Sequence, residues 1–182
     1  MSIESPQRAP KSALDTAANI AIIVTCIFVI GMFSYNTFFK AAPPAPRPPG
    51  LAQKGETLKA LQAVLPAGSG QTLVMAVAPG CHFCDESLPF YKQLIEERNQ
   101  KGSKVQVMAA VPMQGAEETK NAEQAKLTGA GVTPDHLVNV DFSAIKVPGT
   151  PTLLLVDHQG KVLDVWVGKL DPDGEKAVLA RL

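Results

Sequence analysis

The sequence predicts an α/β protein: a mixed β-sheet sandwiched by helices and preceded by one N-terminal transmembrane helix. Two observations support this fold class. From about residue 55 onward, apolar strand-like runs alternate with helical patterns, which is typical of a sheet covered by helices. Before that point, residues 17–39 contain no charged side chain. The chain of 182 residues therefore has room for one membrane segment and one domain with its own core.

Charge composition narrows the range of partners. The whole chain has a formal net charge of zero, and residues 51–182 carry 13 basic and 15 acidic side chains. No run of lysines or arginines forms a basic stripe. Because nucleic-acid-binding domains concentrate positive charge on one face, we expect no nucleic-acid partner.

Residues 1–16 form a short N-terminal tail, and residues 17–39 are predicted to span a membrane. At about 1.5 Å per residue, an uncharged helix of this length can cross a hydrocarbon core of about 30 Å. The alternative is a cleaved signal peptide. Cleavage requires small residues at positions −3 and −1, and the possible sites place Phe39, Lys40 or Pro43 at −3. A retained anchor is therefore favoured.

The orientation of this anchor follows from the length of the tail. Basic residues flank the segment on both sides, so the positive-inside rule does not decide the topology. A short tail favours a signal-anchor whose large domain is translocated. We therefore expect a single-pass membrane protein with its domain on the extracytoplasmic (periplasmic) side. Cys26 is interpreted as a small apolar residue facing the membrane.

Residues 40–54 are predicted to be a proline-rich linker. Its segment Ala41–Gly50 reads AAPPAPRPPG, which cannot form a helix and favours polyproline II, a stiff spacer of about 3.1 Å per residue. The alternative is a proline-rich ligand for an aromatic groove.

The domain is predicted to cover residues 55–182. Apolar periodicity and turn residues predict its elements. The first half contains a short helix within Gly55–Leu65, a strand at Thr72–Ala78, a helix from the cysteines to about Gln100 that Pro89 bends, and a strand at Lys104–Val111. A mostly solvated helix at Ala116–Leu127, a short strand at Leu137–Val140 and a turn at Phe142–Lys146 follow. The chain then forms a hairpin of Leu153–Val156 and Lys161–Val167, and a helix from Asp171–Pro172 to Leu182.

Two cysteines stand where the first strand gives way to a helix. Cys81 and Cys84 follow Pro79 and Gly80, and the pattern turns helical after them. Unpaired backbone N–H groups at a helix start stabilise negative charge, and the thiolate is the reactive form of cysteine. The spacing also lets Cys84 reach back to Cys81. The pair is therefore suited to a reversible disulfide.

Other interpretations of the cysteine pair need residues that the sequence does not supply in an obvious place. Half of a structural zinc site would require two more ligands, and besides Cys26 only three histidines remain: His82, His136 and His158. Haem attachment requires a histidine directly after the second cysteine, where Asp85 stands. A plain structural disulfide remains an alternative.

The chain resembles the thioredoxin-like superfamily from about Gln71 to Leu182. The resemblance is carried by Cys81-His82-Phe83-Cys84 after a strand, by Pro89 beyond the second cysteine, and by the block Gly149–Leu155 before a hairpin. The extra helix between the strands near Lys104 and Leu137 is similar to the membrane-anchored TlpA-like and redoxin branch. The resemblance implies a thioredoxin-like fold in which Pro151 is a cis-proline facing the dithiol. Thr150 and Pro151 would then shape the substrate groove.

Three positions depart from the family pattern. Gly80 replaces the usual tryptophan before the first cysteine, and Met75 replaces the buried acid of thioredoxin. Asp85 stands where many thioredoxins have a lysine, and Glu86 follows it. Two carboxylates beside a dithiol are expected to oppose thiolate formation.

The sequence therefore predicts a membrane-tethered thiol–disulfide oxidoreductase. Cys81 is expected to be the nucleophile and Cys84 the resolving thiol, with His82 and Phe83 between them tuning the pair. The expected partners are proteins with cysteines and a redox-recycling partner, with no cofactor and no metal. Two alternatives from other classes are a Cu(I) delivery protein, in which both thiolates hold the metal, and a redox-inert adaptor that uses only the groove.

Overall fold

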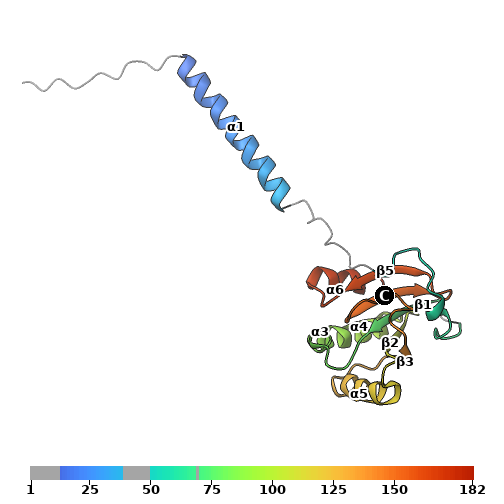
Figure 1. Cartoon of the computed structure of the whole chain (residues 1–182). Helices are drawn as coiled ribbons and strands as arrows, with labels where there is room; N and C mark the ends of the chain where they lie inside the picture. Colours follow the sequence, from blue (N-terminus) through green and yellow to red (C-terminus); the bar gives the residue numbers. More distant parts are fainter. Residues whose placement is uncertain (1–12, 39–49, 69) are drawn as a thin grey trace, which may run out of the picture. The chain divides into compact units, whose positions relative to one another are not determined.

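The computed structural model describes residues 13–38, 50–68 and 70–182, without the side chains of 13–16 and 34–38. The chain divides into two compact units, Met1–Pro46 and Arg47–Leu182 (Figure 1). Each unit is described by itself below.

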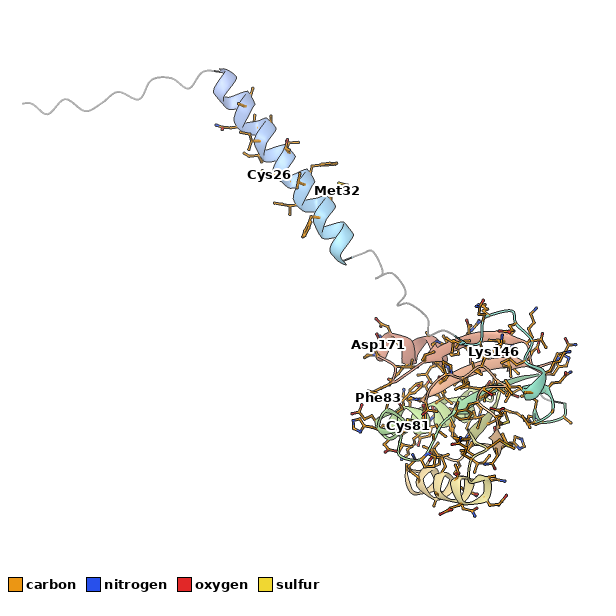
Figure 2. All side chains as sticks on the ribbon, in the orientation of Figure 1. Cys26, Met32, Cys81, Phe83, Lys146 and Asp171 are labelled. Atoms are coloured by element: carbon orange, nitrogen blue, oxygen red, sulfur yellow. A yellow bond between two sulfur atoms is a disulfide. The ribbon has the colours of Figure 1, made fainter. Side chains whose placement is uncertain are left out.

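The first unit contains helix α1, Ala13–Phe38, which begins inside the predicted N-terminal tail. Its large apolar side chains, including Ile27, Phe28 and Phe33, are exposed on all sides (Figure 2). In the described part of the chain, no helix combines the length and the apolarity needed to cross a membrane. The predicted segment 17–39 is thus helical through Phe38, but its predicted membrane span has no support from the structure. The rest of the tail and residues 39–49 lie outside the described residues.

The second unit is built on a five-stranded mixed sheet with the order β3-β2-β1-β4-β5. Parallel pairing joins β1 to β2 and β2 to β3, whereas β4 is antiparallel to both β1 and β5. The strands are β1 (Gln71–Ala76), β2 (Gln106–Pro112), β3 (His136–Val140), β4 (Thr152–Asp157) and β5 (Val162–Val167). The predicted mixed α/β sheet is confirmed.

Two hydrophobic cores lie on the two faces of this sheet, because successive strand residues point to opposite faces. Leu73 and Met75 of β1 face the core that α4 (Leu88–Lys101), α5 (Ala116–Gly129) and α6 (Pro172–Leu179) cover. Val74 and Ala76 face the other core. Among the described residues, only α2 (Lys59–Gln62) with the residues after it and the irregular segments around Ala52 and 142–147 cover that second face. The sandwich is therefore unequal, with long helices on one side only.

The helix predicted after the cysteines is interrupted. It consists of α3 (His82–Glu86) and α4, joined at Ser87. Pro89 is near the start of α4, where a proline is tolerated because the first N–H groups of a helix have no internal partner. The predicted bend is thus a break. Gly102 ends α4 with a positive φ of 62°, as an αL cap requires.

The folded unit begins earlier than the predicted boundary at residue 55. Leu51 and Ala52 are buried, and the amide of Ala52 donates to the carbonyl of Lys146. Lys54 forms an ion pair with Asp164 of β5. The end of the predicted linker 40–54 is therefore part of the domain, because Leu51 is buried and Ala52 belongs to the core under the poorly covered face of the sheet.

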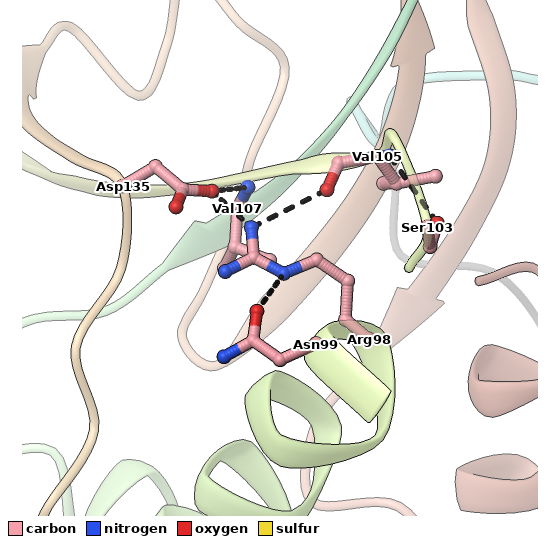
Figure 3. Close-up of polar contacts among 6 residues, drawn as sticks. All are labelled: Arg98, Asn99, Ser103, Val105, Val107 and Asp135. Carbon is pink, nitrogen blue, oxygen red and sulfur yellow. Dashed lines mark hydrogen bonds and ion pairs between the residues drawn. The ribbon is translucent and has the colours of Figure 1, made fainter. Parts of the chain in front are cut away.

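A buried arginine closes the end of the sheet where β2 and β3 begin. Arg98, in the last turn of α4, forms an ion pair with Asp135 and also donates to the carbonyl of Val105 and the side chain of Asn99 (Figure 3). Asp135 accepts a second bond from the amide of Val107, at 2.8 Å. One side chain thus links α4 to the starts of two strands.

Candidate active site

The cysteine pair lies directly beyond the carboxyl end of the central strand β1. Gly80 adopts a φ of +71°, which turns the chain sharply into α3 at little cost for a residue without a side chain. Cys81 is the N-cap of α3, and its sulfur accepts a bond from the amide of Cys84 at 3.1 Å. A disulfide joins Cys81 to Cys84. The strand–helix junction expected from the sequence is thus confirmed.

The two sulfur-bearing residues differ in their access to solvent. Cys84 is buried at 1 % exposure and belongs to the core under α4, whereas Cys81 is half-buried at the edge of that core. Figure 2 shows Cys81 and Phe83 together at one end of the domain. A partner could therefore reach Cys81 more readily than Cys84.

The loop before β4 lies at the same end of the sheet. The bond between Thr150 and Pro151 is cis, as the family resemblance implied. Thr152 pairs with Ala76, the last residue of β1, so this register brings Pro151 to the end of the strand that leads to the dithiol. Pro151 is buried, and its carbonyl accepts from the amide of Gly168 at 2.7 Å. The pairing of Thr152 with β1 and this hydrogen bond from Gly168 hold the loop in place.

Each carboxylate beside the dithiol has a lysine partner from a distant part of the chain. Glu86 lies 2.8 Å from the Nζ of Lys169, just beyond β5, and 3.1 Å from the exposed ring of His82. The Lys169 ammonium, with a smaller effect of His82, holds the pKa of Glu86 below its usual value. The Nζ of Lys126, on α5, lies 2.9 Å from Asp85. The two lysines therefore reduce the unfavourable effect that Asp85 and Glu86 were expected to have on a thiolate.

Exposed apolar side chains lie at the end of the sheet that carries the dithiol. In the described part of this unit, three large hydrophobic residues are exposed: Phe83 at 55 %, Met113 at 57 % and Val167 at 39 %. Phe83 stands between the cysteines, and Met113 follows β2, which is parallel to β1. Val167 pairs with Thr152. All three therefore lie at the dithiol end of the sheet, where they form an apolar rim.

The comparisons agree with this geometry. The family model described as a thioredoxin-like domain matches residues 58–182, which is more than half of the chain. The chain belongs to the thioredoxin-like family. Among curated proteins, no sequence matches.

Solved structures resemble this thioredoxin-like chain in their fold. StoA from Bacillus subtilis has a TM-score of 0.50 and 13 % identity, covering 63 % of this chain and 84 % of its own. A thiol-disulfide isomerase from Corynebacterium glutamicum has a TM-score of 0.49 and 17 % identity, covering 63 % and 80 %. A putative thiol:disulfide interchange protein DsbE from Chlorobium tepidum has a TM-score of 0.47 and 24 % identity, covering 62 % and 77 %.

Sequence reasoning identified the dithiol and the proline loop of this thioredoxin-like domain, but it missed their surroundings. Lys126 and Lys169 are far from the cysteines in sequence, so no local pattern connects them to Asp85 and Glu86. The spacing of Glu123 and Lys126 on one helix was the only available sign of an ion pair there. Across the described residues, no group of three or more His, Cys, Asp or Glu side chains could hold a metal ion.

Proposed function

We propose that this protein is a membrane-tethered thiol–disulfide oxidoreductase that exchanges its dithiol with cysteines of partner proteins. The observation that carries the proposal is the Cys81–Cys84 disulfide at the start of α3, at the same end of the sheet as the Pro151 loop. The match of residues 58–182 to the thioredoxin-like family supports the same reaction class.

The proposed reaction follows from the unequal exposure of the cysteines. In the reduced form, the thiolate of Cys81 attacks one sulfur of a partner disulfide. The partner's S–S bond breaks, an S–S bond to Cys81 forms, and the departing thiolate takes a proton. The Cys84 thiol then gives up its proton and attacks Cys81, which releases the second partner thiol. Two electrons pass to the partner, and the reverse sequence oxidises a partner dithiol.

The apolar rim and the proline loop are the proposed docking surface for the partner segment. Phe83, Met113 and Val167 offer exposed apolar surface at the end of the sheet that carries the half-buried Cys81. Thr150 and Pro151 border the same end of the sheet, and a proline has no N–H to compete for neighbouring carbonyls. We propose that both the substrate proteins and a redox-recycling partner bind this surface, and that both exchange disulfides with Cys81.

The membrane tether is the part of the proposal that rests on sequence. The charge-free segment 17–39 and the proline-rich residues that follow it are suited to an anchor and a spacer. As the position expected of a signal-anchored domain, we propose the extracytoplasmic side. The full-length chain should stay with membranes after an alkaline carbonate wash. A mature N-terminus at or beyond Ala41 would contradict the anchor.

Trapping experiments test the proposed reaction in the full-length chain. Cys84→Ser should accumulate mixed disulfides between Cys81 and partner proteins, because the resolving thiol is missing. Cys81→Ser is the matched control and should trap none. The reverse pattern would exchange the two roles. If mass spectrometry of the wild-type chain shows no two-proton difference at this pair with and without reductant, the oxidoreductase assignment fails.

A further inference from the structure

A buried carboxylate lies on α5 beside the helices that carry the dithiol. Glu123 is 1 % exposed, and among the described residues it is the one acidic side chain that is buried. The helix was predicted to be mostly solvated. Since an isolated carboxylate is costly to bury, a cation is needed close to it.

That cation is Lys126, which also contacts the residue after Cys84. Its Nζ lies 2.8 Å from Oε1 of Glu123 and 2.9 Å from Oδ1 of Asp85. Neither contact is aligned as a hydrogen bond, so charge holds the group together. Although burial opposes the ammonium charge, Glu123 and Asp85 raise the pKa of Lys126 above its ordinary value. Lys126 therefore remains a cation between two carboxylates.

The position of Asp85 gives this cation a consequence for the dithiol. Asp85 directly follows Cys84, and an unpaired carboxylate there would disfavour a thiolate on either cysteine. The other ionisable groups near the pair, His82, Glu86 and Lys169, already form their own cluster. Lys126 is thus the cation that offsets Asp85.

We propose that Lys126, held in place by buried Glu123, is a positioning residue of the dithiol: it neutralises Asp85 and thereby stabilises the thiolate of the reduced pair. This inference rests on the proposed function. Without Lys126, two carboxylates remain unpaired beside α3, and the reduced form loses thiolate stabilisation. Glutathione converts the protein disulfide into the protein dithiol: two glutathione thiols become one glutathione disulfide. Without Lys126, the equilibrium of this reaction should move toward the protein disulfide.

The first test compares Lys126→Gln with the wild-type full-length chain in glutathione redox buffers. We expect the equilibrium to move about threefold toward the disulfide, which is about 14 mV for a two-electron couple. The midpoint of the pH profile for alkylation of Cys81 by iodoacetamide should rise. Lys101→Gln is the matched control, since it removes the same charge from an ion pair with Glu97. That pair lies about 20 Å along α4 from the dithiol end, so neither readout should move.

A double-mutant cycle with Asp85→Asn separates this role from a structural one. Asp85 is half exposed, so its replacement leaves the fold intact. Asp85→Asn alone should lower the alkylation midpoint, and Lys126→Gln should have a much smaller effect in this background, because the lysine acts through Asp85. Lys126→Arg should restore the wild-type profile.

The outcomes distinguish this inference from the proposed function. Equal effects of Lys126→Gln and Lys101→Gln, or an undiminished effect of Lys126→Gln beside Asp85→Asn, would overturn the role of Lys126. If Lys126→Gln does not fold, an unchanged alkylation midpoint of Cys81 in Asp85→Asn would also overturn the proposed role of Lys126. A wild-type chain without a reducible disulfide would instead refute the proposed function.

Discussion

The two ends of the sheet use ion pairs for different purposes. At the end where β2 and β3 begin, Arg98 and Asp135 form a cluster whose polar groups have aligned partners (Figure 3). At the dithiol end, Lys126 is held between Asp85 and Glu123 by charge, without aligned hydrogen bonds. That end also exposes the apolar rim of Phe83, Met113 and Val167.

This difference indicates that one end of the sheet contributes to stability and the other end to reactivity. An arginine has a planar fork of donors, so Arg98 can join a helix to two strands in one fixed geometry. A lysine is a point charge on a flexible stem, which suits neutralisation of a carboxylate without a fixed direction. We therefore expect substitutions at the Arg98 end to change stability and those at the dithiol end to change exchange.

The largest expected effect on stability is at Asp135. Asp135→Asn removes the charge that compensates buried Arg98, and breaking a buried pair costs about 3–5 kcal/mol. Because the side chain of Asp135 is one-third exposed, we expect a smaller loss in the free energy of unfolding, about 2 kcal/mol. Urea denaturation of the full-length chain measures it. The glutathione equilibrium of the dithiol should not change, and a shift there would break the proposed separation of the two ends.

Acid should remove the contribution of the Arg98–Asp135 ion pair to the free energy of unfolding. Although partial burial opposes ionisation, Arg98 and the amide of Val107 hold the pKa of Asp135 below its usual value. A carboxyl whose pKa is lower in the folded state stabilises the fold above its unfolded pKa of about 3.9 and loses this contribution as the pH falls through the folded pKa. The difference in unfolding free energy between wild type and Asp135→Asn should thus be constant from pH 7 to about 5 and shrink below about 4. A difference that grows in acid would contradict this assignment.

The apolar rim should matter for protein partners and not for small ones. Replacing Phe83 and Met113 together by serine removes exposed apolar contacts, and the loss of such interface side chains costs about 1 kcal/mol. We expect kcat/KM for a protein disulfide to fall about fivefold, with little change for glutathione disulfide. Gln159→Ser, in the exposed hairpin turn at the other end, is the control. Equal losses for both substrates would show that the rim affects the dithiol itself.

The smallest expected effect is at a carboxylate with two exposed cationic partners, which belongs to neither of the two clusters compared above. Asp164 forms ion pairs with Lys54 and Arg181, which have exposed side chains. Such pairs contribute about 0–1 kcal/mol because water and salt screen them. Asp164→Asn should therefore lower the free energy of unfolding by less than about 1 kcal/mol, and high salt should remove the difference. A loss as large as that of Asp135→Asn would mean that the stability effect does not depend on the burial of the cation, which is the difference between Arg98 and the exposed Lys54 and Arg181.

Sequence alone determined the features that depend on local order. Apolar runs bounded by turn residues predicted the strands, which face a core on each side of the sheet, and helical spacing of apolar residues predicted most helices. The cysteine spacing after Gly80 predicted the strand–helix junction that the structure contains. The family resemblance indicated the cis bond before Pro151. The predicted roles of Cys81 and Cys84 stay predictions until they are tested.

Tertiary structure decided the features that depend on residues far apart in the chain. It placed Lys126 and Lys169 beside Asp85 and Glu86, buried Glu123 in a helix expected to be solvated, and brought Leu51 and Ala52 into the core. It also brought Phe83, Met113 and Val167 to the same end of the sheet as the dithiol. No local periodicity encodes such neighbours, because charge pairing and burial act through space, and only the path of the strands sets which distant residues meet at one end of a sheet.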